Sequence, residues 1–137
     1  MHDSIQQAMS ANPTTVGPTN TAAEAAQIMK SEDVGSLPIV EGDRLVGVIT
    51  DRDLAIRIVA EGRGPDTPVG EIASKDVVTV DPEQTIDEAA RLMAEHQVRR
   101  LPVVEEDGRL VGILAQADIA QTGQDALTGD TVQQISQ

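Results

Sequence analysis

The 137-residue sequence contains no cysteine and no phenylalanine, tyrosine or tryptophan. The absence of cysteine excludes disulfides, thiolate catalysis and cysteine-ligated zinc. The absence of aromatic rings leaves the core to aliphatic side chains and methionine, and gives a base or sugar nothing to stack on. Apolar residues still make up 39%, and a chain of this length can bury roughly two-thirds of its surface. We therefore expect one domain, or two small halves that need each other.

Positive charge is also scarce, with 10 basic against 23 acidic residues and a formal net charge of -13. Such a chain repels nucleic acids and anionic membranes, so we expect neither as a partner. Residues 1–7 lack the basic start and apolar stretch of a signal peptide. No apolar run approaches the roughly 20 residues of a membrane span. These features predict a cytoplasmic protein whose anionic ligands, if any, bind at a local cluster of basic residues.

The hydrophobic periodicity of the first half predicts helices and strands in a fixed order. Their order is helix, strand, helix, two strands joined by a tight turn, and helix, over residues 1–10, 14–16, 21–32, 37–40, 44–50 and 51–60. Thr21 and Glu24 match a capping box, in which each side chain satisfies a backbone N–H at the start of a helix. The last helix is expected to bury Leu54, Ile58 and Val59.

The pattern restarts after a Gly- and Pro-rich linker. Pro38 aligns with Pro102, an offset of 102 − 38 = 64. Identical residues at that offset are Thr15, Val16, Pro18, Thr21, Glu24, Ala25, Ala26, Met29, Val34, Leu37, Pro38, Val40 and Glu41. One inserted residue in the second hairpin turn, 106–108, shifts the offset to 65, where Arg44, Leu45, Val46, Gly47, Asp53 and Ala55 match. Two unrelated units would not keep this register across turns, caps and prolines, so we interpret it as internal duplication.

The duplication predicts an α/β (α+β) fold with two pseudo-twofold-related repeats, each strand-helix-strand-strand-helix. One repeat alone leaves an apolar sheet face open, so we expect the two to pack sheet to sheet. The expected boundaries are 1–62 for the first repeat with its N-terminal helix, 63–68 for the linker, 69–121 for the second repeat and 122–137 for a polar tail. Within that tail, residues 131–136 could form a short helix.

Thr50 and Asp53 stand three apart where a predicted strand runs directly into a helix. This spacing fits a helix cap, and a strand-to-helix junction can also receive a phosphate. The spacing alone favours the cap, although the two roles are compatible. The second copy keeps the carboxylate as Asp118 and replaces the threonine with Ala115.

The repeats carry enough residues to resemble a known family. Residues 34–40, Val-Gly-Ser-Leu-Pro-Ile-Val, and 98–104, Val-Arg-Arg-Leu-Pro-Val-Val, each precede a hairpin and a helix. Together with the Gly47–Asp53 junction they look like the CBS domain, twice over, across about residues 4–120. Segments 49–53 and 95–100 are similar to short stand-alone bacterial members of the hypoxic response type. The resemblance implies a tandem pair, or Bateman module, which binds adenosine-containing ligands such as AMP, ADP or ATP in two clefts and often dimerises.

The resemblance also assigns residues to each cleft. In the family, the aspartate takes the two ribose hydroxyls, the hydroxyl three residues before it approaches a phosphate or ribose oxygen, and basic residues before the Leu-Pro strand contact phosphates. The better cleft would comprise Thr50, Arg52, Asp53, Val77, Val78, Val98, Arg99, Arg100 and Pro102. The degraded cleft would comprise Thr14, Val34, Gly35, Pro38, Ala115 and Asp118. We expect unequal sites, because Ala115 has no hydroxyl and Gly35 stands where the second repeat has Arg99.

Two function classes remain open at this stage. The first is a regulatory module that needs no cofactor, has an adenine nucleotide as its regulatory ligand and signals through a homodimer or an unknown protein partner. The second is a ligand-independent scaffold for dimerisation or protein interaction, which the missing threonine and the acidic charge favour. We expect no enzyme activity, because the chain has no convergent acid pair with histidine and no Ser-His-Asp order. His96 fits a helix C-terminus, and the acidic residues lack metal-loop spacing.

Overall fold

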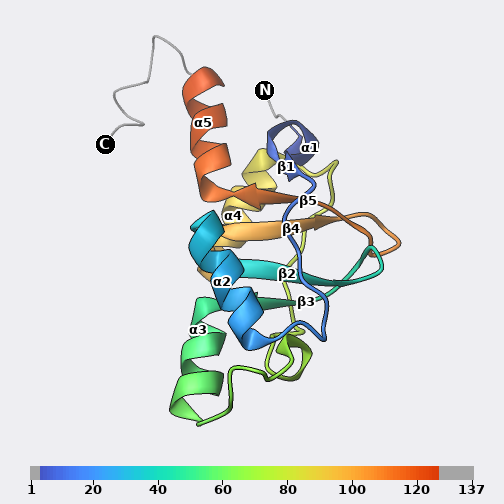
Figure 1. Ribbon diagram of the computed structural model, residues 1–137. Helices are drawn as coiled ribbons and strands as arrows, with labels where there is room; N and C mark the ends of the chain where they lie inside the picture. Colours follow the sequence, from blue (N-terminus) through green and yellow to red (C-terminus); the bar gives the residue numbers. More distant parts are fainter. Residues whose placement is uncertain (1–3, 127–137) are drawn as a thin grey trace. The chain divides into compact units, whose positions relative to one another are not determined.

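A computed structural model describes residues 4–126, with side chains to residue 121 (Figure 1). Helices alternate with small sheets in the predicted order, which confirms a mixed helix and strand fold. The elements are α1 (Ile5–Ala8), β1 (Ser10–Ala11), α2 (Ala22–Glu32), β2 (Ser36–Glu41), β3 (Arg44–Thr50), α3 (Asp51–Asp53), η1 (Leu54–Ala60), η2 (Val69–Glu71), α4 (Ile86–His96), β4 (Arg100–Val104), β5 (Leu110–Ala115) and α5 (Gln116–Ala126). Among the described helices, none is long and apolar enough to cross a membrane.

The chain divides into two compact units that do not follow its order. Among the described residues, the first-repeat unit comprises 14–77 and 107–110, and the second-repeat unit comprises 4–13, 78–106 and 111–126. The segment that precedes each repeat therefore packs with the other repeat. The boundaries at residues 62 and 69 stay a prediction about the duplicated sequence, and they are not the boundaries of the compact units.

The first-repeat unit is built on the antiparallel β2–β3 hairpin, whose turn places Gly42 at φ 66°. Its capping box is formed as predicted, since the Thr21 N–H donates to Glu24 Oε1 at 2.8 Å and the Glu24 N–H donates to Thr21 Oγ1 at 3.1 Å. Val48 on β3 forms an antiparallel bridge with Ser74. The buried core consists of Val16, Ala22, Ala25, Met29, Leu37, Ile39, Ile49, Val69 and Ile72.

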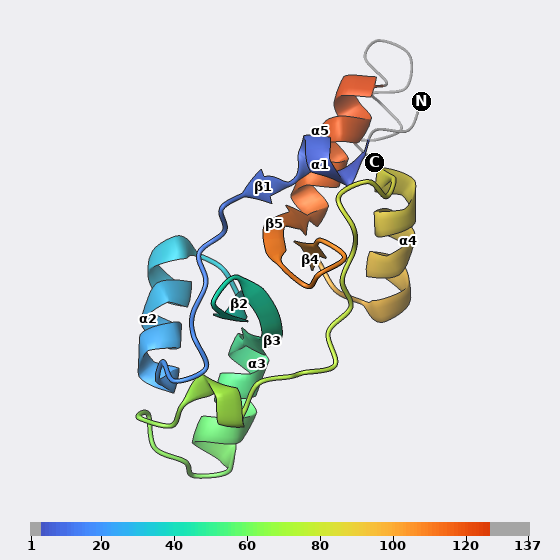
Figure 2. The same cartoon turned by 90° about the vertical axis from the view of Figure 1, so that its right-hand side faces the viewer.

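The second-repeat unit has the three-stranded sheet order β1-β5-β4, with β1 antiparallel to β5 (Figure 2). Ser10 pairs with Ile113, which repeats the Ser74–Val48 bridge of the other unit at offsets of 64 and 65. The segment that precedes each repeat is thus a duplicated element, because it adds the same strand contact to the other repeat. The buried core consists of Ile5, Val80, Ile86, Ala89, Met93, Leu101, Val103 and Leu114.

The hairpin turns of the two repeats meet within the first-repeat unit. Arg44 and Arg109, equivalent residues of the duplication, face each other as an antiparallel bridge. The Leu45 N–H donates to the Gly108 carbonyl at 3.0 Å, and the Leu110 N–H donates to the Asp43 carbonyl at 2.9 Å. These two bonds explain why residues 107–110 belong to the first-repeat unit.

Three local expectations need correction. Residues 14–16 form no strand, and Val16 makes only a parallel bridge with Ile39. The helix predicted over 51–60 begins as α3 and continues as the π-helix η1. Val59 is 78% exposed there, so its expected burial is wrong, whereas Leu54 and Ile58 do pack against the core. A π-helix changes the spacing of side chains around the axis, which a period of 3.6 does not anticipate.

The expected polar tail over residues 122–137 stays a prediction. Helix α5 continues to Ala126, so the stretch predicted as a polar tail begins inside a helix. The short helix expected at residues 131–136 lies outside the described residues.

Candidate functional site

The first-repeat junction is a complete capping box. The Asp53 N–H donates to Thr50 Oγ1 at 3.0 Å, and the Thr50 N–H donates to Asp53 Oδ2 at 3.0 Å. Both residues are half-buried. An ionised carboxylate has about four acceptor positions, and the cap uses one of those on Asp53. Capping therefore leaves Asp53 with acceptor capacity for hydroxyl donors, such as the two hydroxyls of a ribose.

The second-repeat junction keeps only the carboxylate half of this box. The Ala115 N–H donates to Asp118 Oδ2 at 2.9 Å, in the same geometry as the Thr50–Asp53 bond. Ala115 has no hydroxyl with which to complete the box. The same backbone bond thus holds the carboxylate in both repeats, and only the first-repeat junction has the threonine hydroxyl.

Each junction is also tied to the start of the Leu-Pro strand in its own unit. The Asp51 N–H donates to the Gly35 carbonyl at 2.9 Å, and the equivalent Gln116 N–H donates to the Arg99 carbonyl at 2.8 Å. A Cβ at Gly35 would lie 3.0 Å from Asp51 Oδ2. The two positions are therefore occupied by Asp51 and Gly35 in the first-repeat unit, and by Gln116 and Arg99 in the second-repeat unit.

The remaining predicted site residues divide between the units. The first-repeat unit contains Thr14, Val34, Gly35, Pro38, Thr50, Arg52, Asp53 and Val77, and the second-repeat unit contains Val78, Val98, Arg99, Arg100, Pro102, Ala115 and Asp118. Each unit thus brings one aspartate junction together with the strand start expected to wall the other repeat's cleft. The composition of the two complete clefts stays a prediction.

The walls of the predicted clefts differ in burial. Pro38 and Pro102 are buried, and their carbonyls accept from Val16 and Val80 at 3.0 Å. Both prolines therefore contribute to the packing and the backbone hydrogen bonding of their own units. Thr14 is exposed, and its hydroxyl donates to Glu32 at 3.1 Å.

The valines and basic residues of the predicted site lie nearer the surface. Val34, Val77 and Val78 are half-buried, and Val98 is exposed. Arg52 and Arg99 are exposed and Arg100 is half-buried, and none of the three forms an ion pair with another described residue. These guanidinium groups are consequently available to an anionic ligand.

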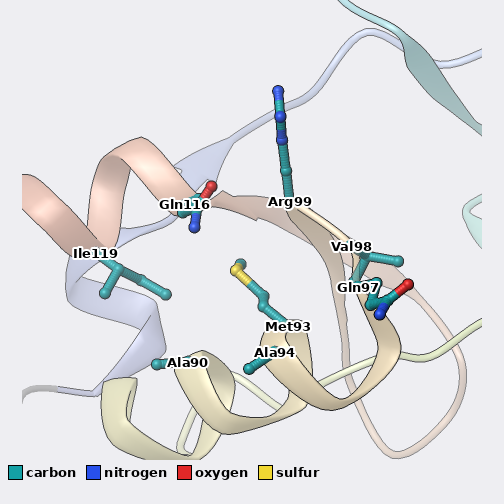
Figure 3. A pocket seen from close by; sticks show the side chains of 8 residues that line it. All are labelled: Ala90, Met93, Ala94, Gln97, Val98, Arg99, Gln116 and Ile119. Atoms are coloured by element: carbon teal, nitrogen blue, oxygen red, sulfur yellow. The ribbon is translucent and has the colours of Figure 1, made fainter.

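A hollow of about 450 Å³ opens between α4, the start of β4 and α5 (Figure 3). It is lined by Ala90, Met93, Ala94, Gln97, Val98, Arg99, Gln116 and Ile119. In Figure 3 the Met93 sulfur points into this space, while the Arg99 side chain extends away from it. The sequence predicted Val98 and Arg99 only as cleft walls and did not predict the hollow, although Ala90 and Ala94, four apart on one helix, could have indicated a shallow face.

Two carboxylates outside the junctions have shifted pKa values. The backbone N–H of Thr21 is the main cause that lowers the pKa of Glu24 below 4.5, with further hydrogen bonds from Asn20 and the Thr21 side chain. The backbone N–H of Thr85 likewise lowers the pKa of Glu88, with the Thr85 side chain and Gln84 contributing. These shifts belong to the capping boxes of α2 and α4. They identify structural carboxylates, and they do not indicate catalysis.

The duplicated unit, the aspartate junctions and the paired hairpins define a tandem module of small α/β repeats. The family model of the CBS domain matches residues 4–60 and 69–124. The chain therefore belongs to the CBS domain family, as the resemblance predicted.

Individual relatives support this assignment. The chain is 44% identical over 117 residues to the CBS domain-containing protein YhcV of Bacillus subtilis, covering 85% of this chain and 83% of that protein. It is 47% identical over 115 residues to hypoxic response protein 1 of Mycobacterium tuberculosis, covering 82% and 80%. The crystal structure of Hypoxic Response Protein I, with two coordinated zinc ions, has a TM-score of 0.79 at 45% identity and covers 87% of this chain and 98% of that one.

Two further solved structures contain adenosyl ligands. CBSX2 in complex with AMP has a TM-score of 0.80 at 26% identity, covering 90% of this chain and 97% of that chain. The CBS domain pair of protein MJ0100, in complex with 5-methylthioadenosine and S-adenosyl-L-methionine, has a TM-score of 0.80 at 28% identity, covering 92% and 99%. Among the side chains that the structure describes, no group of three or more His, Cys, Asp or Glu residues could hold a metal ion.

Proposed function

We propose that the chain is a regulatory module that binds an adenosine-containing ligand and transmits its presence through a homodimer or a protein partner. One observation carries the proposal: both repeats fix an aspartate carboxylate by the same backbone bond, at 3.0 and 2.9 Å. The adenosyl complexes of two structural relatives support the ligand class. No catalytic step forms part of this proposal.

The two clefts are unequal in this proposal. The Asp53 cleft combines the carboxylate with the Thr50 hydroxyl, and Arg99 and Arg100 would supply its phosphate contacts. The planar donor fork of arginine suits phosphate oxygens. The Asp118 cleft lacks the hydroxyl and has Gly35 in place of an arginine, so a phosphate would be held less well there.

Ligand action follows from population shift. A ligand that binds two repeats better in one arrangement than in another stabilises that arrangement, with typical couplings of about 1–3 kcal/mol. The output then reaches a partner through the surface of the dimer. The sequence expectation of a cytoplasmic setting is consistent with an intracellular nucleotide as the ligand.

A thermal-shift panel tests the proposal, with AMP, ADP, ATP, S-adenosylmethionine, 5-methylthioadenosine and NAD(H) as ligands. A ligand at 100 times its Kd should add about 2.7 kcal/mol to the free energy of unfolding, which is several degrees for a chain of this size. Without tyrosine or tryptophan, bound adenine would also dominate the near-ultraviolet spectrum. No shift with any ligand would contradict the proposal.

The variants compare the two carboxylates. Asp53→Ala should abolish the ligand-dependent shift and Asp118→Ala should retain it, each measured against its own ligand-free melting temperature. Asp53→Asn is the matched control, because its amide oxygen can still accept from the Thr50 N–H while the charge is lost. Equal losses in Asp53→Ala and Asp118→Ala would contradict the inequality of the clefts.

A ligand-independent scaffold is the second candidate function. The exposed aliphatic side chains of η1, Ile56 at 37% and Val59 at 78%, favour it because they suit an interface. The thermal-shift panel separates the two functions, since a scaffold shows no ligand-dependent stabilisation.

A further inference from the structure

The first-repeat unit contains a second hollow, of about 240 Å³, between the β2–β3 hairpin and the segment 69–75 that begins with η2. Seven residues line it: Pro18, Ile39, Glu41, Val46, Gly70, Ala73 and Lys75. All of them belong to this unit, and none is a predicted residue of the two adenosyl clefts. The volume lies below the roughly 300–1,000 Å³ of pockets that bind drug-sized ligands. The hollow therefore suits a metabolite smaller than a nucleotide.

The backbone around this hollow is repeated in the second-repeat unit. The Gly70 N–H donates to the Pro18 carbonyl at 2.9 Å, and the Gln6 N–H makes the equivalent bond to the Pro82 carbonyl at 2.9 Å. The bridges of Ser74 and Ser10 to the hairpin strands, described above, are also equivalent. The second-repeat unit thus provides an internal control in which only the side chains at this place differ.

The side chains at this place are longer in the second-repeat unit. Met9 lies so close over the sheet that a Cβ on Gly112 would meet its Sδ at 2.5 Å, whereas a Cβ on Gly47 would lie 3.8 Å from the Cβ of Ala73. The lining residues on segment 69–75, namely Gly70, Ala73 and Lys75, correspond to Gln6, Met9 and Ala11 at an offset of 64. The first-repeat unit therefore has two shorter side chains there and one additional cation.

The hollow combines two opposite charges with an otherwise apolar lining. Lys75 and Glu41 are exposed, and neither forms an ion pair with another described residue. The other five lining residues are glycine, alanine, proline, isoleucine and valine. A carboxylate ligand without an ammonium group would leave Glu41 opposed by like charge, and an amine without a carboxylate would do the same to Lys75. A small zwitterion with an aliphatic side chain matches all of these features.

We propose that this hollow binds a free aliphatic α-amino acid. The ammonium of Lys75 pairs with the ligand carboxylate, the carboxylate of Glu41 pairs with the ligand ammonium, and such charge-assisted hydrogen bonds fix the orientation. The aliphatic side chain of the ligand packs against Ile39, Val46 and Ala73. The second-repeat unit does not bind at the equivalent place, because Met9 takes up the space and Ala11 carries no charge. The site is independent of the proposed nucleotide binding, since the two share no residue.

Methyl NMR with L-leucine as the probe tests the proposal on the full chain. Leucine at up to about 10 mM, about ten times a Kd of about 1 mM, should shift the methyl resonances of Ile39, Val46 and Ala73 until they saturate. Isoamylamine is leucine without its carboxylate, and isocaproate is leucine without its amino group. Each should bind at least threefold more weakly than leucine, because exposed ion pairs contribute modestly. No saturable shift with leucine, or an analogue that binds as tightly as leucine, overturns the proposal.

Charge variants test the two assigned pairs separately. Lys75→Ala should weaken leucine and isocaproate at least threefold without weakening isoamylamine, and Glu41→Gln should weaken leucine and isoamylamine without weakening isocaproate. Lys75→Arg should retain leucine binding. Lys30→Ala is the matched control, because Lys30 is the only other lysine of the chain and lies exposed on α2. Equal effects of Lys30→Ala and Lys75→Ala, or of either charge variant on both analogues, overturn the proposal.

A variant that fills the hollow provides the last measurement. Ala73→Met introduces the residue that the second-repeat unit has at this position, and should weaken leucine at least tenfold. The methyl spectrum of the ligand-free variant shows whether it is folded, and the exposed charge variants decide the question if it is not. A folded Ala73→Met that binds leucine as tightly as the wild type overturns the proposal.

Discussion

The two repeats share a backbone plan and differ in residues at the strand-to-helix junction and in the helix that follows it. Both fix a carboxylate at the strand-to-helix junction, and both open their first helix with a capping box. The segment that precedes each repeat, here called the crossing segment, pairs with the second hairpin strand of the other repeat, through Ser10 in one unit and Ser74 in the other. They differ where Thr50 is matched by Ala115, and where Val59 is matched by Gln124. The duplication thus preserves what the fold needs, and the differences lie at positions that the shared fold does not constrain.

The crossing segments show how one plan tolerates different packing. In the second-repeat unit, Met9 lies directly over Gly112 on β5. In the first-repeat unit the equivalent residue is Ala73, and a smaller hollow of about 240 Å³ opens there. Both glycines are needed because the crossing backbone approaches closely, but the methionine makes the second contact tighter.

The largest effect is expected from substituting these glycines. A Cβ at Gly112 would lie 2.5 Å from Met9 Sδ and 2.9 Å from the Ser10 carbonyl oxygen, whereas a Cβ at Gly47 would meet the Ser74 carbonyl oxygen at 3.0 Å. Overpacking costs about 1–3 kcal/mol. Gly112→Ala should therefore lower the free energy of unfolding by about 3 kcal/mol and Gly47→Ala by about 1 kcal/mol, measured by urea denaturation.

The methionine provides the control for this pair. In Gly112→Ala combined with Met9→Ala, the sulfur contact is removed and only the carbonyl contact remains. Met9→Ala should then lower the free energy of unfolding by less in the Gly112→Ala background than in the wild-type protein. Equal losses for the two glycine variants would show that the crossing segments adapt equally well, and the packing difference would carry no energetic meaning.

Local sequence signals predicted most of the elements. Thr21 with Glu24 located the start of α2, and glycine at position 42 located the hairpin turn, because both depend on residues close in the chain. The exposure of Val59 was missed because the π-helix changes the helical period. The partners of the crossing segments were missed because nothing local in Ser10 or Ser74 specifies which strand it will join.

The candidate site was predictable in part for the same reason. The internal repeat identified Asp53 and Asp118, and the structure shows that both carboxylates accept the same backbone bond. The hollow beside α4 was not predicted, because it depends on side chains from three separate elements. Residues far apart in sequence, such as Ala90 and Ile119, line it only after folding.

An intermediate effect is expected from exchanging the residues that distinguish the two junctions. Thr50→Ala removes the hydroxyl that accepts from the Asp53 N–H, and should lower the free energy of unfolding by about 1 kcal/mol. Ala115→Thr places a hydroxyl where the second box is incomplete, and should raise it by about 0.5–1 kcal/mol. Chemical denaturation measures both changes, and a destabilised Ala115→Thr would mean that the second junction has no room for a hydroxyl.

The same exchange sharpens the proposed inequality of the clefts. Isothermal titration with the ligand found in the thermal-shift panel should give weaker binding in Thr50→Ala than in the wild type. Ala115→Thr should strengthen the weaker site without altering the stronger one. An unchanged affinity in Thr50→Ala would assign the hydroxyl to capping alone.

The smallest effect concerns a feature in which the two repeats agree. Glu24 and Glu88 close equivalent capping boxes, and backbone hydrogen bonds hold the pKa of each carboxyl below 4.5 in the folded chain. Because the folded-state pKa is depressed, the stability from each group is present above the unfolded-state pKa and is lost as the pH falls through the folded-state pKa. The loss should therefore occur below about pH 4.5.

Glutamine substitutions isolate this contribution, because the amide oxygen can still accept from the N-cap N–H while it no longer titrates. In Glu24→Gln and Glu88→Gln, the free energy of unfolding should fall less steeply with decreasing pH below 4.5 than in the wild type, and by similar amounts. Glu83→Gln, an exposed carboxylate outside the boxes, gives the background change for loss of one negative charge. Glu24 is exposed and Glu88 is half-buried, so the effect should also decrease as salt screens the interaction. A clear difference between Glu24→Gln and Glu88→Gln would show that the repeats diverge even in their structural caps.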